Sequence, residues 1–191
     1  MGKQRSPKKW QRLEETLLCK TRVFDLYKQR MKSSNRDFES DFFYLKSRDF
    51  VNVIPITPED EVVMLRQYRH GADNISLEFP GGIIDSPGEK ARDAALRELR
   101  EETGYEAQEI ELLSEIHPNP AIQNNICYGF VARGLEKVSG QDLDPAEEIE
   151  VELIPLSELP DLIRAGEVTH SLMLSVFLHF LLSRGRVDLS D

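Results

Sequence analysis

The stretch Arg97-Glu98-Leu99-Arg100-Glu101-Glu102-Thr103-Gly104 is the most informative part of this sequence. At about 100° per residue, a helix stacks Glu98 and Glu102 one above the other and places Glu101 one turn from Glu98. Three alanines, Ala91, Ala94 and Ala95, fall on the same side. The helix therefore carries three carboxylates on its small-residue face, the face expected to pack closely against the rest of the protein.

Two interpretations of this acidic cluster are open. An acidic helical stretch is usually a solvated charge run. Here, however, like charges four residues apart repel each other, and acids near the C-terminal end oppose the helix dipole. We infer that the cluster holds a cation, and oxygen ligands favour Mg²⁺, with Mn²⁺ as the alternative. Arg97 and Arg100 are expected to orient the outer carboxylates.

The sequence also carries signals for both ends of this helix. Ser86-x-x-Glu89 has the form of a capping box, and Pro87 would occupy the first helical position. Gly104 is typical of a helix C-terminal stop. These signals predict a helix over residues 86–103.

Gly82, Glu89 and the run from Arg97 to Tyr105 resemble the Nudix box of the Nudix hydrolases. Six residues lie between Gly82 and Glu89, one more than is usual in that family, so we interpret Ser86 as an insertion in the loop before the helix. The resemblance extends from about Phe50 to Leu182.

The resemblance implies hydrolysis of a nucleoside diphosphate linked to another group, with a divalent metal. Glu98 and Glu102 match the principal metal ligands, Glu101 matches an additional ligand, and the backbone carbonyl of Gly81 matches a further one. Bound metal neutralises a pyrophosphate and activates a water molecule. A chain with a net charge of −10 needs such a cation beside an anionic substrate.

Upstream of the box, RQYRHG (66–71) and LEFPGG (77–82) resemble the ADP-ribose and nucleoside diphosphate sugar pyrophosphatases. This resemblance implies substrate-binding roles for Arg69, for Glu78 and, with a weaker match, for Arg66. An ordinary salt bridge is the alternative for both arginines. Pro120 lies near the marker proline of this subgroup, but Asn119-Pro120-Ala121 replaces the more usual Ser-Pro-Gly, so we expect a substrate range broader than ADP-ribose alone.

An acidic loop over residues 142–148 precedes the last expected strand. In the resembling subgroup, a glutamate from such a loop is the general base. Glu147 and Glu148 both match it, and the alternation of the following strand does not decide between them. Glu101 is the alternative catalytic residue, and a solvated role is open for any single acid of the loop.

The hydrophobic pattern and the resemblance together predict an α/β (α+β) sandwich, the Nudix fold with a mixed sheet between helices, plus N-terminal antiparallel strands. The segments 51–57 and 61–69 are expected to form a hairpin. Two helices, near residues 157–165 and 170–182, are expected to close the chain. We divide the chain into an N-terminal strand meander, residues 1–48, and a Nudix domain, residues 49–191.

The N-terminal strands carry an expectation about assembly. In the resembling subgroup such strands exchange across a homodimer and help to form the nucleoside pocket, so a homodimer is expected here. Phe42, Phe43 and Tyr44 are candidates for stacking on a base, with a plain core role as the alternative.

Composition limits the other functions. The net charge of −10 over 191 residues argues against a nucleic-acid partner, which would need a basic face. Two distant cysteines, no signal-peptide pattern and no apolar run near the about 20 residues that span a bilayer indicate a cytoplasmic protein away from membranes. Two alternatives remain: a Nudix hydrolase of coenzyme A or nucleoside triphosphates, and a Nudix-like module that only senses its ligand.

Overall fold

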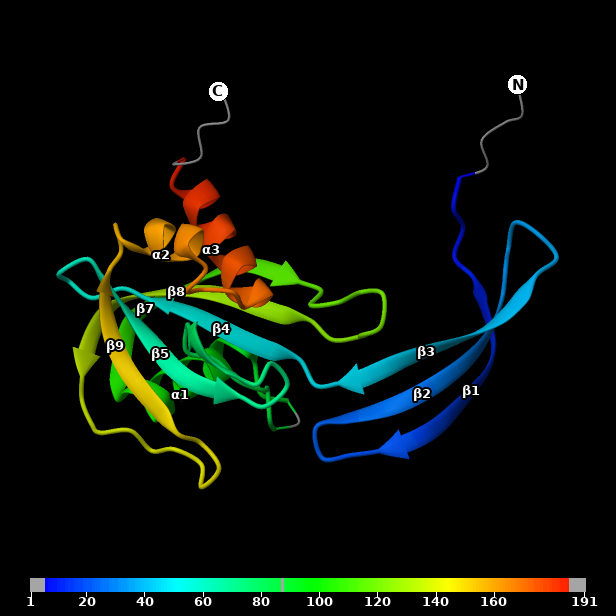
Figure 1. Ribbon diagram of the computed structural model, residues 1–191, viewed down its shortest axis with the longest axis horizontal. Helices are drawn as coiled ribbons and strands as arrows, with labels where there is room; N and C mark the ends of the chain where they lie inside the picture. Colours follow the sequence, from blue (N-terminus) through cyan, green and yellow to red (C-terminus); the bar gives the residue numbers. More distant parts are fainter. Residues whose placement is uncertain (1–5, 87, 186–191) are drawn as a thin grey trace. The chain divides into compact units, whose positions relative to one another are not determined.

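The computed structural model describes residues 6–86 and 88–185, and these residues form two compact units (Figure 1). One unit comprises the chain up to Arg48 together with Asn119–Asn125. The other comprises Asp49–Pro118 and the chain from Ile126 onward.

The first unit is a three-stranded antiparallel sheet, as the meander pattern predicts. Its strands are β1 (Gln11–Lys20), β2 (Phe24–Lys32) and β3 (Glu39–Ser47), in the order β1-β2-β3. The segment Asn119–Asn125 is bonded to β3, because the backbone N–H of Leu45 donates to the carbonyl oxygen of Ile122 at 2.7 Å. Strand β1 is exposed along its whole length, including Leu13, Leu17 and Leu18.

The second unit contains two further sheets and three helices. One sheet is mixed, in the order β4 (Phe50–Pro55), β8 (Cys127–Lys137) and β7 (Tyr105–Ile116), with β4 parallel to β8. The other is antiparallel, in the order β6 (Asn74–Glu78), β5 (Glu61–Arg69) and β9 (Ile149–Pro155). The helices are α1 (Ala91–Thr103), α2 (Leu159–Ala165) and α3 (Ser171–Ser183).

The mixed sheet lies between α1 and α3 (Figure 1), which confirms the predicted sandwich. Strand alternation produces this arrangement, because successive side chains of β4 point to opposite faces. Val51 and Val53 pack with the α1 side of the core, whereas Ile54 packs with the buried residues of α3. The alanines of α1 let the helix approach the sheet closely, which brings its acidic last turns against the protein body.

The predicted hairpin between segments 51–57 and 61–69 is wrong. The strands β4 and β5 diverge after one isolated bridge between Ile56 and Val62. The reason is that both edges of β4 are occupied: β8 pairs with one edge, and residues 80–82 bond to the other. The N–H of Val51 donates to the carbonyl oxygen of Gly82, and the N–H of Val53 donates to that of Pro80. The second edge of β4 therefore pairs with the glycine turn and not with β5.

Helix α1 starts at Ala91 rather than at residue 86. Lys90 is the N-cap, and Gly88 has a φ of 90°, a left-handed conformation that interrupts a helix at that point. The carboxylate of Glu89 still accepts hydrogen bonds from the N–H groups of Asp85 and Ser86, so it organises the loop rather than the helix start. The expected role of Pro87 lies outside the described residues. Gly104 ends the helix as predicted, with a φ of 75°.

None of the helices within residues 6–86 and 88–185 combines the length and the apolar character needed to cross a membrane.

Candidate active site

Two carboxylates of α1 are buried in the interior of the second unit. Glu98 is 9% exposed and Glu102 is 4% exposed, and both continue the face that carries Ala94 and Ala95. Glu101, one turn from Glu98, is only half-buried. The structure therefore places Glu98 and Glu102 on the inner face, as the sequence predicts, and Glu101 at its rim.

The glycine pair of the 80–82 turn lies directly against these carboxylates. A Cβ atom added to Gly82 would lie 2.4 Å from Oε1 of Glu98, and one added to Gly81 would lie 2.2 Å from the carbonyl oxygen of Val51. The N–H of Gly81 donates to Oε2 of Glu102 at 2.8 Å. Only glycine permits this approach, so the backbone of the turn and the two carboxylates form one compact polar group.

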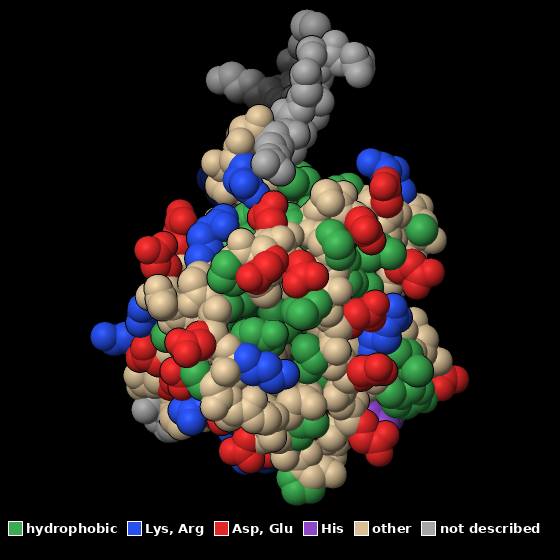
Figure 2. Space-filling model, turned by 90° about the vertical axis from the view of Figure 1, so that its left-hand side faces the viewer, with side chains coloured by type: hydrophobic (Ala, Val, Ile, Leu, Met, Phe, Trp, Pro, Cys, Tyr) green, Lys and Arg blue, Asp and Glu red, His purple; other side chains and the backbone are tan. Residues whose placement is uncertain are grey.

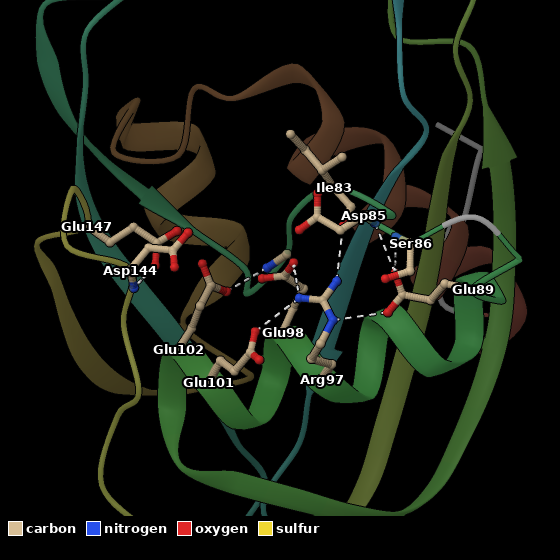
Figure 3. A network of polar contacts seen from close by, with 11 residues as sticks. Ile83, Asp85, Ser86, Glu89, Arg97, Glu98, Glu101, Glu102, Asp144 and Glu147 are labelled. Carbon is tan, nitrogen blue, oxygen red and sulfur yellow. Dashed lines mark hydrogen bonds and ion pairs between the residues drawn. The ribbon is translucent and has the colours of Figure 1, made fainter. Parts of the chain in front are cut away.

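The side chain of Arg97 bonds to three acidic residues of the cluster (Figure 3). Its Nη1 donates to Glu98 at 2.8 Å and to Glu101 at 3.0 Å, and its Nε donates to Glu89 at 3.0 Å. Its Nη2 donates to the carbonyl oxygen of Ile83 at 3.1 Å, which ties the helix to the preceding turn. The expected orienting role of Arg100 is wrong: Arg100 pairs with the exposed Glu106 at 3.5 Å.

The electrostatics of the buried pair favour a bound cation. Burial raises the pKa of Glu98 to about 7 and raises the pKa of Glu102 well above its ordinary value. The neighbouring carboxylates, including Glu147, raise both pKa values further, whereas Arg97 lowers that of Glu98 and the Gly81 N–H lowers that of Glu102. Two adjacent buried anions are therefore costly without a counter-charge.

The donor set fits a hard divalent ion such as Mg²⁺, because several carboxylates line the site. Within the described parts of the chain, no three acidic, imidazole or thiol side chains converge on one point as a complete ligand set. Arg97 bridges Glu98 and Glu101 in this arrangement, so an ion would have to compete with it for those oxygens.

The acidic loop separates its two candidate bases. Glu147 lines a cavity of about 580 Å³ together with the carboxylates of α1, whereas Glu148 is exposed and does not line it. A local turn holds Glu147, since its N–H donates to the carbonyl oxygen of Asp144 at 2.9 Å and its carboxylate accepts from the N–H of Asp144 at 3.1 Å. Pro145 follows Asp144, a pair that favours such a turn, so the sequence contained this signal.

Figure 3 shows Glu147 and Asp144 projecting from the loop toward Glu102 and Glu101 of α1. The cavity between them is lined by Gln67, Arg69, Gly81, Gly82, Ile83, Asp85, Ser86, Arg97, Glu98, Glu101, Glu102, Asp142, Leu143, Asp144 and Glu147. Most of the polar side chains that line this cavity are acidic. On the face of the molecule drawn in Figure 2, by contrast, Lys and Arg side chains lie among Asp and Glu. An anionic ligand in this cavity therefore needs the few cations that face it.

Arg69 is one of those cations, and Arg66 is not. Nε and Nη2 of Arg69 donate to the two carboxylate oxygens of Glu78 at 2.9 and 2.6 Å, so Arg69 also makes the salt bridge named as its alternative while it lines the cavity. Although burial by itself raises the pKa of Glu78, Arg69 lowers it below its usual value. Arg66 instead donates to Glu152 at 2.6 Å and does not line the cavity, so it makes the salt bridge named as its alternative.

A second cavity, of about 310 Å³, shares Arg69 and the glycine turn with the first as part of its wall. Its polar walls include Asn52, Glu78 and His170, and its apolar walls include Phe50 and Met173. Burial lowers the pKa of His170, so the ring is neutral near pH 7. No spacing in the sequence points to His170, because this residue reaches the site from the start of α3.

The first unit has a separate pocket, of about 450 Å³. It is lined by Arg12, Gln29, Phe42, Phe43, Tyr44 and the segment from Pro120 to Asn124. Phe42 and Phe43 are exposed, whereas Tyr44 stacks on Tyr27 and bonds to Glu15 through its hydroxyl group. The three aromatic candidates and Pro120 therefore share one pocket, with two of the rings open to solvent.

Known proteins share sequence similarity with most of this chain. The sequence model of the NUDIX domain matches residues 46–174. A methanol dehydrogenase activator of Bacillus methanolicus is 36% identical over 122 residues, which cover 63% of this chain and 65% of the relative, just under two thirds of its length. An ADP-ribose pyrophosphatase of Bacillus subtilis (strain 168) is 29% identical over 167 residues, covering 82% of this chain and 86% of the relative.

The fold is also found among solved structures. The crystal structure of an ADP compounds hydrolase superposes with a TM-score of 0.83 and 26% sequence identity, covering 96% of this chain and 100% of that chain. The match spans both units, including the N-terminal strands.

Proposed function

Since the chain belongs to the Nudix hydrolase family, we propose that it hydrolyses the pyrophosphate bond of nucleoside diphosphate sugars, ADP-ribose included, with Mg²⁺. The products are a nucleoside monophosphate and a sugar phosphate. The observation that carries the proposal is the buried pair Glu98 and Glu102, packed against the backbone of Gly81 and Gly82 inside an acidic cavity. A cation bound beside such a pair would favour its doubly ionised form.

Each residue then has a defined task. Glu98, Glu102 and the carbonyl group of Gly81 would hold the ion, with Glu101 as an additional ligand. When bound, the ion supplies positive charge to the pyrophosphate and acidifies a water molecule. Arg97 keeps Glu98 and Glu101 in place, and Glu147 accepts the proton of the attacking water from the opposite wall of the cavity. Phosphoryl transfer needs mainly this kind of positioning and charge.

Three features support a nucleoside diphosphate sugar as the substrate. Arg69 lies in the wall shared by the two cavities of the second unit, where a guanidinium can bind phosphate oxygens. The pocket of the first unit presents exposed aromatic rings beside Pro120, which suits a base. The relative with the longer matched stretch, that of Bacillus subtilis, is named an ADP-ribose pyrophosphatase.

The test is a panel of nucleoside diphosphate sugars, dinucleotides, coenzyme A and nucleoside triphosphates, each incubated with Mg²⁺ and analysed by mass spectrometry. We expect the highest kcat/KM among the nucleoside diphosphate sugars, with more than ADP-ribose accepted. Faster cleavage of coenzyme A or of triphosphates would reject this substrate class while leaving the metal site intact. Binding of ADP-ribose without any turnover would favour the ligand-sensing alternative.

Replacing Arg69 is expected to weaken substrate binding. In Arg69→Ala, KM for nucleoside diphosphate sugars should rise about 10- to 100-fold, because a charge-assisted hydrogen bond to phosphate is lost. Arg69→Lys should recover only part of this loss, since an ammonium group cannot make the paired contacts of a guanidinium. Steady-state kinetics on ADP-ribose measures both effects.

The control for this prediction concerns Glu78, whose side chain is 2% exposed and loses its partner in Arg69→Ala. An unpaired buried carboxylate destabilises the fold. The double variant Arg69→Ala/Glu78→Gln removes that charge, so it should fold normally and still show a KM raised above that of the single variant Glu78→Gln, which accounts for the expected substrate-binding role of Glu78. An unchanged KM in this double variant would show that Arg69 serves only the ion pair.

We also propose a homodimer formed through residues 11–48. Strand β1 exposes Leu13, Leu17 and Leu18, and a three-stranded sheet with an uncovered apolar surface gains stability by burying it. Light scattering at micromolar concentration should give twice the chain mass of 21.9 kDa. Leu17→Glu should shift the mass toward the monomer, whereas Leu178→Glu, at an equally exposed leucine of α3, should not. A monomeric wild-type protein would contradict the proposal.

A further inference from the structure

The loop that carries Glu147 is closed at its base by one side chain. Nε2 of Gln141 donates to the carbonyl oxygen of Glu102 at 2.7 Å and to the carbonyl oxygen of Ile149 at 3.1 Å. Gln141 immediately precedes the acidic loop 142–148, and Ile149 immediately follows it. A single amide group therefore joins both ends of the loop to the last turn of α1.

The last turn of α1 provides the acceptors for this connection. The final carbonyl groups of a helix have no partner within the helix. Here the carbonyl of Glu101 accepts from the N–H of Asp142 at 2.8 Å, and the carbonyl of Glu102 accepts from Gln141. The same two residues present their side chains to the cavity, so the loop is bonded to the backbone of the proposed metal-binding residues.

The bonds at the start of the loop help to position the residues that follow. Asp142 and residues 144–146 are exposed, and the turn between Asp144 and Glu147 is internal to the loop, so it fixes the shape of the loop but not its distance from α1. The β5–β9 ladder also fixes Ile149, and Val138 and Ser139 bond to Gly104 upstream of the loop. The bond from Gln141 to Glu102 and the bond from Asp142 to Glu101 are the ones that join the start of the loop itself to the last turn of α1. Proton transfer from a bound water is sensitive to displacements of about 1 Å.

We propose that Gln141 is a positioning residue, which holds Glu147 at the correct distance from Glu98 and Glu102 by joining the two ends of the acidic loop to the C-terminus of α1. The inference rests on the proposed function, in which Glu147 is the general base. Gln141 does not contact the substrate; it acts through the loop.

The kinetic test compares Gln141→Met with Gln141→Lys on ADP-ribose. Methionine keeps the length of the side chain but donates no hydrogen bond, so kcat should fall about 10- to 100-fold with little change in KM. Lysine can donate to the same two carbonyl groups and suits the negative end of the helix, so it should restore most of the activity. Gln108→Met, at an exposed glutamine of β7, is the matched control and should behave as wild type.

A double-variant cycle with Glu147→Gln separates positioning from general destabilisation. If Gln141 acts through Glu147, then adding Gln141→Met to Glu147→Gln should lower kcat less than about twofold. Equal fold-losses in the two backgrounds would overturn the proposal, and so would a Gln141→Lys variant as slow as Gln141→Met.

Hydrogen exchange gives a readout that does not require activity. In Gln141→Met, amide exchange of the segment 142–149 should become faster, while exchange of the β4 core should stay as in wild type. Unchanged exchange in this segment would overturn the role of Gln141 whatever the substrate is. If the wild-type protein cleaves no member of the substrate panel but the exchange result holds, the proposed function fails and the loop connection stands.

Discussion

The variants Glu98→Gln and Glu102→Gln are each expected to lower kcat by about 10³-fold or more at ordinary Mg²⁺ concentration. Each removes one anionic oxygen donor from the buried pair, and several kcal/mol of transition-state stabilisation depend on a correctly held ion. Steady-state kinetics on ADP-ribose measures the loss. The Mg²⁺-dependent rise in melting temperature should shrink in parallel, because weaker binding stabilises the folded state less.

The Glu98→Gln substitution should also make the metal-free protein more stable at high pH. The folded-state pKa of Glu98, about 7, lies above the ordinary glutamate value, so the folded state binds more protons than the unfolded state between those two values. The wild-type protein therefore loses stability as the pH rises through 7. Glu98→Gln avoids that loss, which amounts to about 3 kcal/mol.

Denaturant unfolding with a chelator present measures this difference in the free energy of unfolding. Glu98→Gln should be more stable than wild type at pH 8, and the difference should shrink toward pH 5. Near-normal turnover of both glutamine variants, together with an unchanged response to Mg²⁺, would exclude the buried pair as the metal site.

The second large effect is expected at Glu147. In Glu147→Gln, kcat should fall about 10²- to 10⁴-fold, which is the usual contribution of a positioned base, with little change in metal affinity. Glu148→Gln is the matched control, because Glu148 is the adjacent acid but is exposed and does not line the cavity. Its kcat should stay near that of wild type.

Other outcomes for these two variants would contradict the role of Glu147 as the general base. If Glu148→Gln carries the loss instead, the loop must rearrange on substrate binding. If the double variant turns over normally, the base is Glu101 or a metal-bound hydroxide. Calorimetric titration with Mg²⁺ separates these outcomes from simple loss of the ion.

Local sequence was sufficient for the parts of the site that lie on one element. The helical period placed Glu98 and Glu102 on the inner face, and Gly104 ended the helix where expected, because both effects act within a few residues. The predicted helix start at residue 86 was wrong for a local reason. Gly88 adopts a left-handed conformation between Ser86 and Ala91, and the capping-box pattern did not indicate this.

The remaining parts depend on contacts between residues far apart in the sequence. The partner of Arg66 is 86 residues away, and Gln141 reaches a carbonyl group 39 residues before it. The hairpin prediction failed because β4 is paired on one edge with β8, which lies more than seventy residues later. Propensity and turn signals describe neighbours along the chain, so they could not rank these competing pairings.

The glycine turn limits how this site can be changed by evolution or engineering. Any side chain at Gly82 would overlap the carboxylate of Glu98, and any side chain at Gly81 would overlap β4. A saturation library across the site should therefore return only glycine at these two positions among active clones. Altered substrate ranges have to be selected from the acidic loop and from the side chains that line the second cavity.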